Sequence, residues 1–181
     1  MWTVSNQYAA SLKDLCENRA NLDEAAGQWR LLRGDVPPSE TVRLTVRSGS
    51  MAPFLPVGAE IEVAPASGSE CRVGDVVVFR RGDRLIVHRL LFGWGGEPGA
   101  WFLQRGDGVS PLGFVRARSI LGRVVAVHEA GGACRRFDQP ADRLLGVRQA
   151  RRSLARIVLA TLKAPARKAK RWFQRENTGS G

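Results

Sequence analysis

Short runs of β-branched and aromatic residues, separated by turn residues, constrain the fold of the central half of the chain. The runs are Val42–Val46, Val76–Phe79, Leu85–Leu90, Trp101–Leu103 and Ile120–Val127, and apolar and polar residues alternate in the first of them. Gly-Asp steps at 74–75, 82–83 and 106–107 mark turns beside the runs. No helical pattern lies between consecutive runs. We therefore predict an antiparallel, mainly β domain over residues 41–130, folded as a barrel or a sandwich.

Helical periodicity replaces this pattern at both ends of the chain. Residues 1–40 form a polar segment in which Tyr8, Leu12 and Leu15 have helical spacing, and the prolines at 37–38 end it. Residues 141–176 are predicted as a basic amphipathic helix that Pro165 interrupts. Its apolar stripe is Leu144, Val147, Leu154, Ile157, Val158 and Leu162, and Arg148, Arg151, Arg152 and Arg156 fall largely on the opposite side.

Most of the positive charge belongs to this C-terminal segment. The chain has a net charge of +11, and residues 141–181 hold eleven basic and two acidic residues, which is +9 of that total. A basic appendage on a nearly neutral body is typical of an interaction segment. Two uses stay open. The segment binds anionic lipid headgroups, with Trp172 and Phe173 at the interface, or its apolar stripe packs on the body and its arginines are solvated.

Other features exclude several classes of protein. No apolar stretch approaches the roughly 20 residues that span a bilayer, and residues 1–28 have no apolar signal core. We therefore expect a cytoplasmic protein that is at most peripherally bound to a membrane. Three widely spaced cysteines and two histidines form neither a metal-binding nor a disulfide pattern. We expect no metal and no other cofactor.

Three short stretches of the β region carry candidate catalytic residues. Ser48-Gly49-Ser50-Met51-Ala52-Pro53 follows the first strand, Val87-His88-Arg89 lies within a strand, and Gln104-Arg105-Gly106-Asp107-Gly108 contains a carboxylate. A serine nucleophile needs a base within hydrogen-bond reach, and a carboxylate often orients that base. Each stretch alone is more typical of an ordinary turn or a packed strand than of a catalytic site.

Together these stretches resemble the type I signal peptidase family. The resemblance covers residues 41–128 and includes, in order, Ser48-Gly49-Ser50-Met51-x-Pro53, Val73-Gly74-Asp75-Val76-Val77-Val78-Phe79, Val87-His88-Arg89, Phe102-Leu103-x-x-Gly106-Asp107 and Leu121-Gly122-Arg123-Val124-Val125. It implies the antiparallel β fold that this family shares with self-cleaving repressors. It also implies a serine endopeptidase that cleaves a peptide or a preprotein.

The catalytic base distinguishes two branches of that family. The bacterial branch uses a lysine, and this chain has no lysine between Lys13 and Lys163. Val87-His88-Arg89 resembles instead the branch of the endoplasmic-reticulum and archaeal enzymes, which has a histidine. The resemblance then implies that Ser50 is the nucleophile and His88 its general base. It also implies an oxyanion hole formed by the Ser50 N–H and the Ser48 hydroxyl.

The third catalytic residue departs from the family pattern. The histidine branch usually has a second aspartate about six residues after the Gly-Asp step, and Gly113 stands at that place here. Asp107 is the only carboxylate left in the stretch. Three interpretations stay open: Asp107 orients His88, the site is a Ser–His dyad, or catalysis is impaired.

Two further classes of function compete with the peptidase. A catalytically impaired peptide-binding module would keep the β fold and its groove for an extended peptide, and the glycine at 113 favours it. A nucleic-acid-binding protein would use the basic tail, but the lysine base and helix-turn-helix of self-cleaving repressors are not visible in this sequence. We therefore expect a peptide or preprotein partner rather than a nucleic acid.

Overall fold

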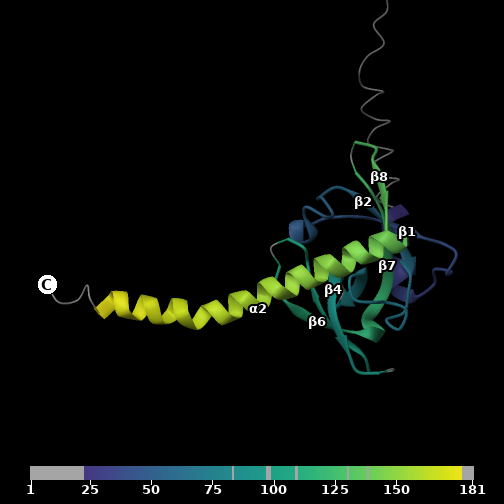
Figure 1. Cartoon of the computed structure of the whole chain (residues 1–181). Helices are drawn as coiled ribbons and strands as arrows, with labels where there is room; N and C mark the ends of the chain where they lie inside the picture. Colours follow the sequence, from purple (N-terminus) through teal and green to yellow (C-terminus); the bar gives the residue numbers. More distant parts are fainter. Residues whose placement is uncertain are drawn as a thin grey trace, which may run out of the picture.

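The protein consists of one antiparallel β-sheet between an N-terminal and a C-terminal helix (Figure 1). The computed structural model describes residues 23–82, 84–96, 99–108, 110–129, 131–137 and 139–176, with side chains as far as Thr161. The predicted mainly β domain with a helix at each end is confirmed for this part of the chain. The first half of the predicted N-terminal helical segment, residues 1–22, lies outside the described residues.

Eight strands and two short 3-10 turns make up the β domain. The strands are β1 (Val42–Thr45), β2 (Glu60–Pro65), β3 (Val76–Arg81), β4 (Arg84–Trp94), β5 (Trp101–Arg105), β6 (Gly113–Arg116), β7 (Ile120–His128) and β8 (Cys134–Arg136). The turns are η1 (Gly49–Met51) and η2 (Ala117–Ser119). The helices cover residues 23–33 and α2 (Pro140–Glu176).

All strand pairs are antiparallel, and one sheet connects them in the order β1-β2-β7-β3-β4-β5-β6, with β8 also paired to β7. Between β1 and β6, the two ends of this order, the described residues form no strand pairing, so the sheet is open rather than a closed barrel. Strand β7 lies between β2 and β3 and pairs with one of them on each edge. The buried apolar residues form two separate cores.

Strand β3 separates the two cores. Val76 and Val78 point into a core built around β1, β2 and the serine-containing turn, while Val77 and Phe79 point into a second core with Leu90, Phe102 and Val115. Because both faces of β3 are buried, its sequence is a continuous apolar run rather than an alternating one. His88 pairs directly with Val77 and therefore faces the second core.

The helix over residues 23–33 packs on β1. Leu31 is buried in the first core, and Gly27 lies so close to β1 that a Cβ at that position would be 2.7 Å from a methyl group of Val42. The Glu24 carboxylate accepts hydrogen bonds from the Thr45 N–H (3.0 Å) and from Arg47 (2.7 Å). These bonds lower the pKa of Glu24 although partial burial opposes them. The segment is therefore a docked part of the β domain.

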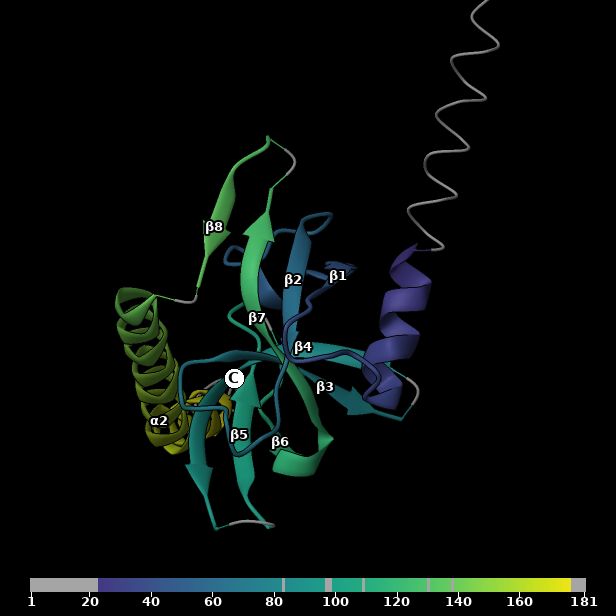
Figure 2. The ribbon, with the colours of Figure 1, turned by 90° about the vertical axis from the view of Figure 1, so that its right-hand side faces the viewer.

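Helix α2 crosses the sheet on the opposite side from residues 23–33 and then extends away from the body (Figures 1 and 2). Its backbone touches the turn before β3: a Cβ at Gly146 would lie 2.7 Å from the Gly74 carbonyl oxygen. Ala150 is fully buried beside this contact. Small residues thus allow the first half of α2 to dock tightly. It is packed on the body rather than a free tail.

One expectation for this helix, its interruption at Pro165, is corrected by the structure. Pro165 does not interrupt α2, which is continuous from Pro140 to Glu176. A proline at 165 leaves the carbonyl of Thr161 without its helical donor, but Thr161 is exposed, and water can pair with that carbonyl. The predicted apolar stripe is only partly buried, because Val147, Leu154 and Ile157 are half-buried whereas Leu144 and Val158 are exposed. Among the described residues, no helix is long and apolar enough to cross a membrane.

Candidate active site

The serine stretch forms a tight turn at the end of β1. Ser50 lies in η1, and its hydroxyl is 3.3 Å from the Ser48 hydroxyl. Within the described residues, nothing accepts a hydrogen bond from the Ser50 N–H. The two groups that the sequence assigned to an oxyanion hole, the Ser50 N–H and the Ser48 hydroxyl, are thus both present at the nucleophile candidate.

The Gly-Asp-Gly loop after β5 holds this turn from behind. The Gly108 N–H donates to the Ser50 carbonyl at 2.9 Å. A side chain at Gly106 would overlap the Ser50 carbonyl oxygen, and one at Gly108 would lie 2.8 Å from the carbonyl oxygens of Gly49 and Ala52. Glycine is required at both positions because backbone meets backbone there. The loop therefore fixes the position of Ser50 by direct contact.

His88 is held by a residue that the sequence analysis did not select. The buried side chain of Gln104 on β5 lies beside the His88 ring, and the two are joined by a short hydrogen bond of 2.5 Å between Nδ1 and Oε1. An amide oxygen only accepts hydrogen bonds, so Nδ1 carries the proton and Nε2 keeps its lone pair. None of the described residues forms a hydrogen bond with Nε2. The free nitrogen is the one that a general base needs.

The electrostatic surroundings keep His88 neutral near pH 7. Burial lowers the pKa of His88 below its ordinary value of 6.5. The positive charge of Arg81 acts in the same direction, whereas the hydrogen bond to Gln104 and the negative charge of Asp107 partly oppose the shift. Desolvation is the largest of these effects. The imidazole is therefore available to accept a proton at neutral pH.

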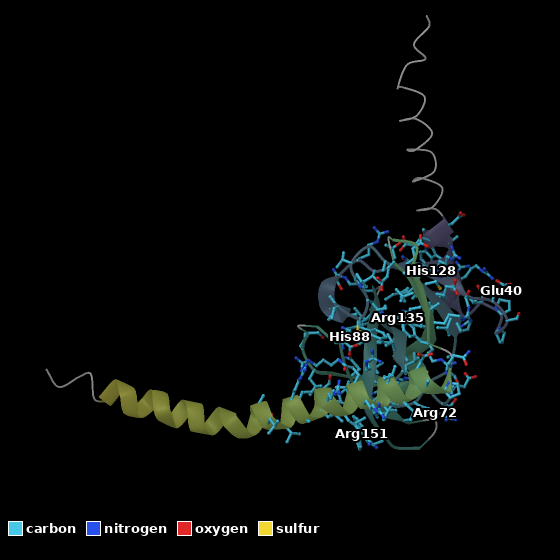
Figure 3. All side chains as sticks on the ribbon, turned by 45° about the horizontal axis from the view of Figure 1, so that its top comes forward. Glu40, Arg72, His88, His128, Arg135 and Arg151 are labelled. Carbon is cyan, nitrogen blue, oxygen red and sulfur yellow. The ribbon has the colours of Figure 1, made fainter. Side chains whose placement is uncertain are left out.

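Ser50 and His88 open onto one pocket of about 560 Å³. Its floor is apolar, its rim carries arginines, and Ser48 and Ser110 also reach it; the apolar residues include Leu44, Val46, Met51, Leu55, Ile61, Leu85 and Val87, and the arginines are Arg47, Arg81 and Arg84. Figure 3 marks His88 within the β body, well away from His128. Ser50 and His88 are not hydrogen-bonded to each other in this structure, and the Ser50 hydroxyl is paired with Ser48 instead.

Asp107 does not orient His88, which corrects the first of the three interpretations of the acid. Its carboxylate forms a two-pronged ion pair with Arg89, with Nε–Oδ1 at 2.9 Å and Nη2–Oδ2 at 2.6 Å. Both side chains are at most 3% exposed. Arg89 also donates to the Gly74 carbonyl at 2.7 Å. As the strand alternation predicted, Arg89 points away from His88 and is structural.

The position of the Gln104 side chain explains why residue 113 is a glycine. The two residues are directly opposite in the β5–β6 pair, so their side chains share a face. A Cβ at Gly113 would overlap the amide nitrogen of Gln104. The Gln104 amide thus fills the space into which an aspartate at 113 would project. Only the cross-strand register reveals this relation, because the two residues are nine positions apart in the chain.

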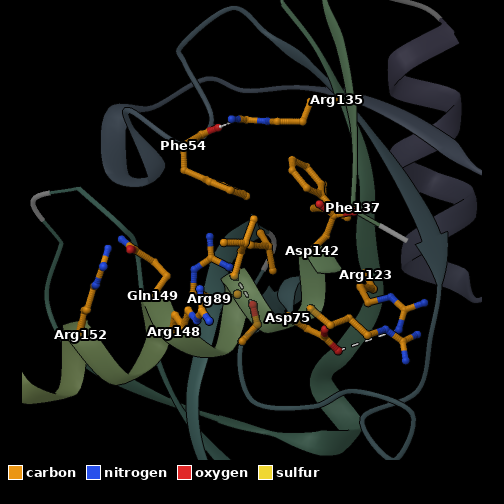
Figure 4. Close-up of a pocket in the computed structure, with 16 residues that line it drawn as sticks. Phe54, Asp75, Arg89, Arg123, Arg135, Phe137, Asp142, Arg148, Gln149 and Arg152 are labelled. Carbon is orange, nitrogen blue, oxygen red and sulfur yellow. Dashed lines mark hydrogen bonds and ion pairs between the residues drawn. The ribbon is translucent and has the colours of Figure 1, made fainter. Parts of the chain in front are cut away.

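A second cavity of about 310 Å³ lies behind the serine turn, between the sheet and α2 (Figure 4). Phe54, four residues after Ser50, is held there between two guanidinium groups. Arg89 lies 4.4 Å from its ring centre, and Arg135 lies 4.9 Å from it and also donates to the Phe54 carbonyl at 2.6 Å. These contacts anchor the C-terminal side of the serine turn to β4 and β8.

Other reactive side chains of the described region do not form a second site of this kind. His128 is hydrogen-bonded to Glu62 at 2.8 Å, and Cys134 is 4.0 Å from the same ring nitrogen. No group of three or more histidine, cysteine or carboxylate side chains in the described part of the chain could hold a metal ion.

Neither a protein-family model nor a curated protein matches this chain.

Proposed function

We propose that the protein is a serine endopeptidase of the signal-peptidase type, in which Ser50 is the nucleophile, His88 the general base and Gln104 the residue that orients the base. One observation carries the proposal: a buried histidine with a proton fixed on Nδ1 and a free Nε2 lines the same pocket as a serine in a rigid turn. The sequence resemblance to the histidine branch of that family supports the same assignment.

The proposed chemistry is acyl transfer. As the Ser50 oxygen attacks the scissile carbonyl carbon, His88 Nε2 takes the hydroxyl proton and then gives it to the leaving amine as the C–N bond breaks. Water hydrolyses the resulting ester by the same route in reverse. The Ser50 N–H and the Ser48 hydroxyl would stabilise the oxyanion, which is worth roughly 3–4 kcal/mol for each well-placed donor.

Gln104 differs from an aspartate in this role because it carries no charge. It fixes the tautomer and the orientation of His88, but it cannot offset the charge of the imidazolium that forms during the reaction. Asp107 supplies the nearby negative charge, since it raises the pKa of His88 although it is paired with Arg89. We therefore assign Asp107 an indirect role, through its negative charge and its ion pair with Arg89, in place of a direct contact with His88.

The pocket supports an extended peptide as substrate. Apolar side chains line its floor, and the exposed arginines 81 and 84 form no ion pair with any described residue. Apolar substrate side chains next to the cleavage site and an acidic residue near the rim would complement this lining. We propose that the substrate is a peptide or precursor protein with such a segment.

A serine-reactive fluorophosphonate probe tests the proposal directly. The Ser50 oxygen would form a bond to phosphorus, fluoride would leave, and His88 would take the proton. We expect stoichiometric labelling at Ser50, located by peptide mass spectrometry, and no labelling of the Ser50→Ala variant. Absence of labelling in the folded protein would favour the alternative, a peptide-binding module without catalysis.

The pH dependence of labelling follows from the His88 environment. His88 is active in its neutral form. The labelling rate is therefore at its maximum at neutral pH and falls as the pH decreases through the lowered pKa of His88. We expect the midpoint of this acid limb below pH 6.5. Replacing Arg81 by glutamine should move the midpoint upward, because the Arg81 charge lowers that pKa. A midpoint above 6.5 in the unmodified protein would contradict the assignment of His88.

The Gln104→Leu variant isolates the orienting hydrogen bond. It removes the acceptor of the Nδ1 proton while keeping an apolar side chain of similar size, and we expect turnover and labelling to fall about 10- to 100-fold, the worth of one hydrogen bond to a group that becomes charged. Gly113→Ala should also lower turnover and labelling, because its methyl group displaces the Gln104 amide. Gly131→Ala, at a position with open space around it, is the matched control.

The double variant Gln104→Ala with Gly113→Asp completes this test. It restores a carboxylate at the position where the resembled family has one, after the amide that occupies the space has been removed. Recovery of activity in the double variant, but not in Gly113→Asp alone, is the expected result. If Gly113→Asp alone were more active than the unmodified protein, Gln104 would not be the orienting residue.

A further inference from the structure

An aromatic surface covers one face of the sheet formed by β4, β5 and β6. Two cross-strand rows make it up, Phe92–Leu103–Phe114 and Trp94–Trp101–Arg116, as the pairing registers show. Phe92, Trp94 and Phe114 are 53%, 41% and 58% exposed. We call this set of six residues the aromatic face. The reverse side of the same strands carries Phe102 and Val115 and is buried in the second core.

The side chains of the aromatic face support one another rather than the protein interior. The Phe92 and Trp94 rings are stacked with centres 6.1 Å apart, Trp94 meets the Phe114 ring edge-on at 5.7 Å, and Arg116 lies 4.7 Å over Trp101. A contiguous aromatic patch of this kind on a soluble surface marks an interaction site. Exposure of three large aromatic side chains to water is unfavourable, so a partner that covers them would stabilise this surface.

Helix α2 lies on the same side of the sheet. Arg89, which contacts α2 near Gly146, pairs with Arg105 on β5, and a bulge between Leu90 and Phe92 keeps Phe92 on the face of Arg89. The helix therefore covers the beginning of this face and leaves the aromatic residues open.

The outer side of α2 mixes arginines with apolar residues. Arg148, Arg151, Arg152 and Arg156 are exposed together with Leu144, Leu145, Val158 and Leu159, and three of these residues, Leu145, Arg148 and Arg152, also line the cavity between the sheet and α2. These four arginines form no ion pair within the described residues. Figure 3 labels Arg151 on this helix. The exposed side of a helix that contacts only water is usually polar, whereas a mixture of arginines and aliphatic residues is typical of a helix at a membrane interface.

We infer that the aromatic face and the outer side of α2 together form a docking surface for an anionic membrane. Tryptophan and phenylalanine partition to the boundary between headgroups and acyl chains, and arginines bind anionic headgroups. A second copy of the chain fits the surface less well, since it would bring two α2 helices of the same charge together. The inference does not depend on the proposed peptidase activity.

Flotation of the full-length protein with vesicles tests the inference. We expect binding to vesicles of phosphatidylcholine with 30% phosphatidylglycerol and much weaker binding to pure phosphatidylcholine. The Phe92→Ser/Phe114→Ser double variant should bind at least ten-fold more weakly, and it should stay folded because both side chains are exposed. Replacing Arg148, Arg151 and Arg152 by glutamine should weaken binding roughly five-fold for each residue.

Trp29→Ser is the matched control, because Trp29 is equally exposed but lies on residues 23–33 on the other side of the body (Figure 2). It should bind the vesicles as the unmodified protein does. Quenching of tryptophan fluorescence by brominated lipids should decrease in the Trp94→Phe/Trp101→Phe variant, which lacks both tryptophans of the aromatic face, and should be retained in Trp29→Phe.

Two results would overturn the inference. In the first, the Phe92→Ser/Phe114→Ser variant binds anionic vesicles as tightly as the unmodified protein, so that α2 alone accounts for binding. In the second, light scattering shows a dimer that the same two substitutions abolish, so that the aromatic face is an interface between copies of the chain.

Discussion

Replacing Ser50 or His88 by alanine is expected to reduce turnover by about 10⁶-fold, with the double variant no worse than either single one. The two residues act as a unit, since the hydroxyl is a poor nucleophile without the base and the base has no proton to accept without the hydroxyl. The measurement is the steady-state rate on a fluorogenic peptide selected from a library of extended peptides, with the rate of fluorophosphonate labelling as a second readout.

Stability provides the control for this prediction. Among the described residues, the Ser50 side chain is hydrogen-bonded to Ser48 alone, so Ser50→Ala should unfold at the same temperature as the unmodified protein. His88→Ala removes one buried hydrogen bond, the one between His88 and Gln104. Additive losses in the double variant, or near-normal turnover in either single variant, would show that Ser50 and His88 do not form the catalytic pair.

Replacing Asp107 by asparagine is expected to destabilise the fold by about 3 kcal/mol. The substitution leaves the Arg89 guanidinium buried without its counter-charge, and breaking a buried ion pair from one side costs about 3–5 kcal/mol. For a domain of this size the loss corresponds to a fall in Tm of roughly 10 °C. Circular dichroism of the unmodified protein and the variant measures it.

An exposed ion pair provides the comparison. Glu40 is paired with Arg30 at 2.6 Å, and both side chains are nearly half exposed, so Glu40→Gln should change the stability by less than 1 kcal/mol. The remaining folded Asp107→Asn protein should keep most of its labelling rate at neutral pH. A variant with normal Tm whose turnover falls about 10⁴-fold would instead identify Asp107 as the acid of a catalytic triad.

Five of the eight strands, β1, β3, β4, β5 and β7, could be predicted from the sequence because their apolar runs depend on local chemistry, whereas β2, β6 and β8 were not predicted. Val76–Phe79 is apolar at every position because β3 is buried on both faces, and this is visible in the sequence as an unbroken run. The direction of Arg89, opposite to His88, follows from strand alternation alone.

The partner of His88 was decided only by the tertiary structure. Gln104 and Asp107 are three residues apart in the chain, and a carboxylate is the more usual partner of a catalytic histidine, so the sequence favoured Asp107. In the fold, the β4–β5 register places Gln104 opposite Leu90, on the face of His88, whereas Asp107 lies beyond the end of β5, within reach of Arg89. Long-range register, which no local pattern encodes, makes that choice.

The docking of the C-terminal helix on the sheet also depends on contacts between distant parts of the chain. The sequence determined that residues 141–176 are helical, basic and amphipathic, but it could not separate a docked helix from a free one. Docking depends on Gly74 and Gly146, two glycines that are 72 positions apart and that let the backbones of a turn and a helix touch. The same packing leaves the aromatic residues of β4 and β6 uncovered beside α2. Local chemistry thus indicated five of the eight strands and the candidate site residues. The pairing of distant segments decided which of those residues lie close to one another.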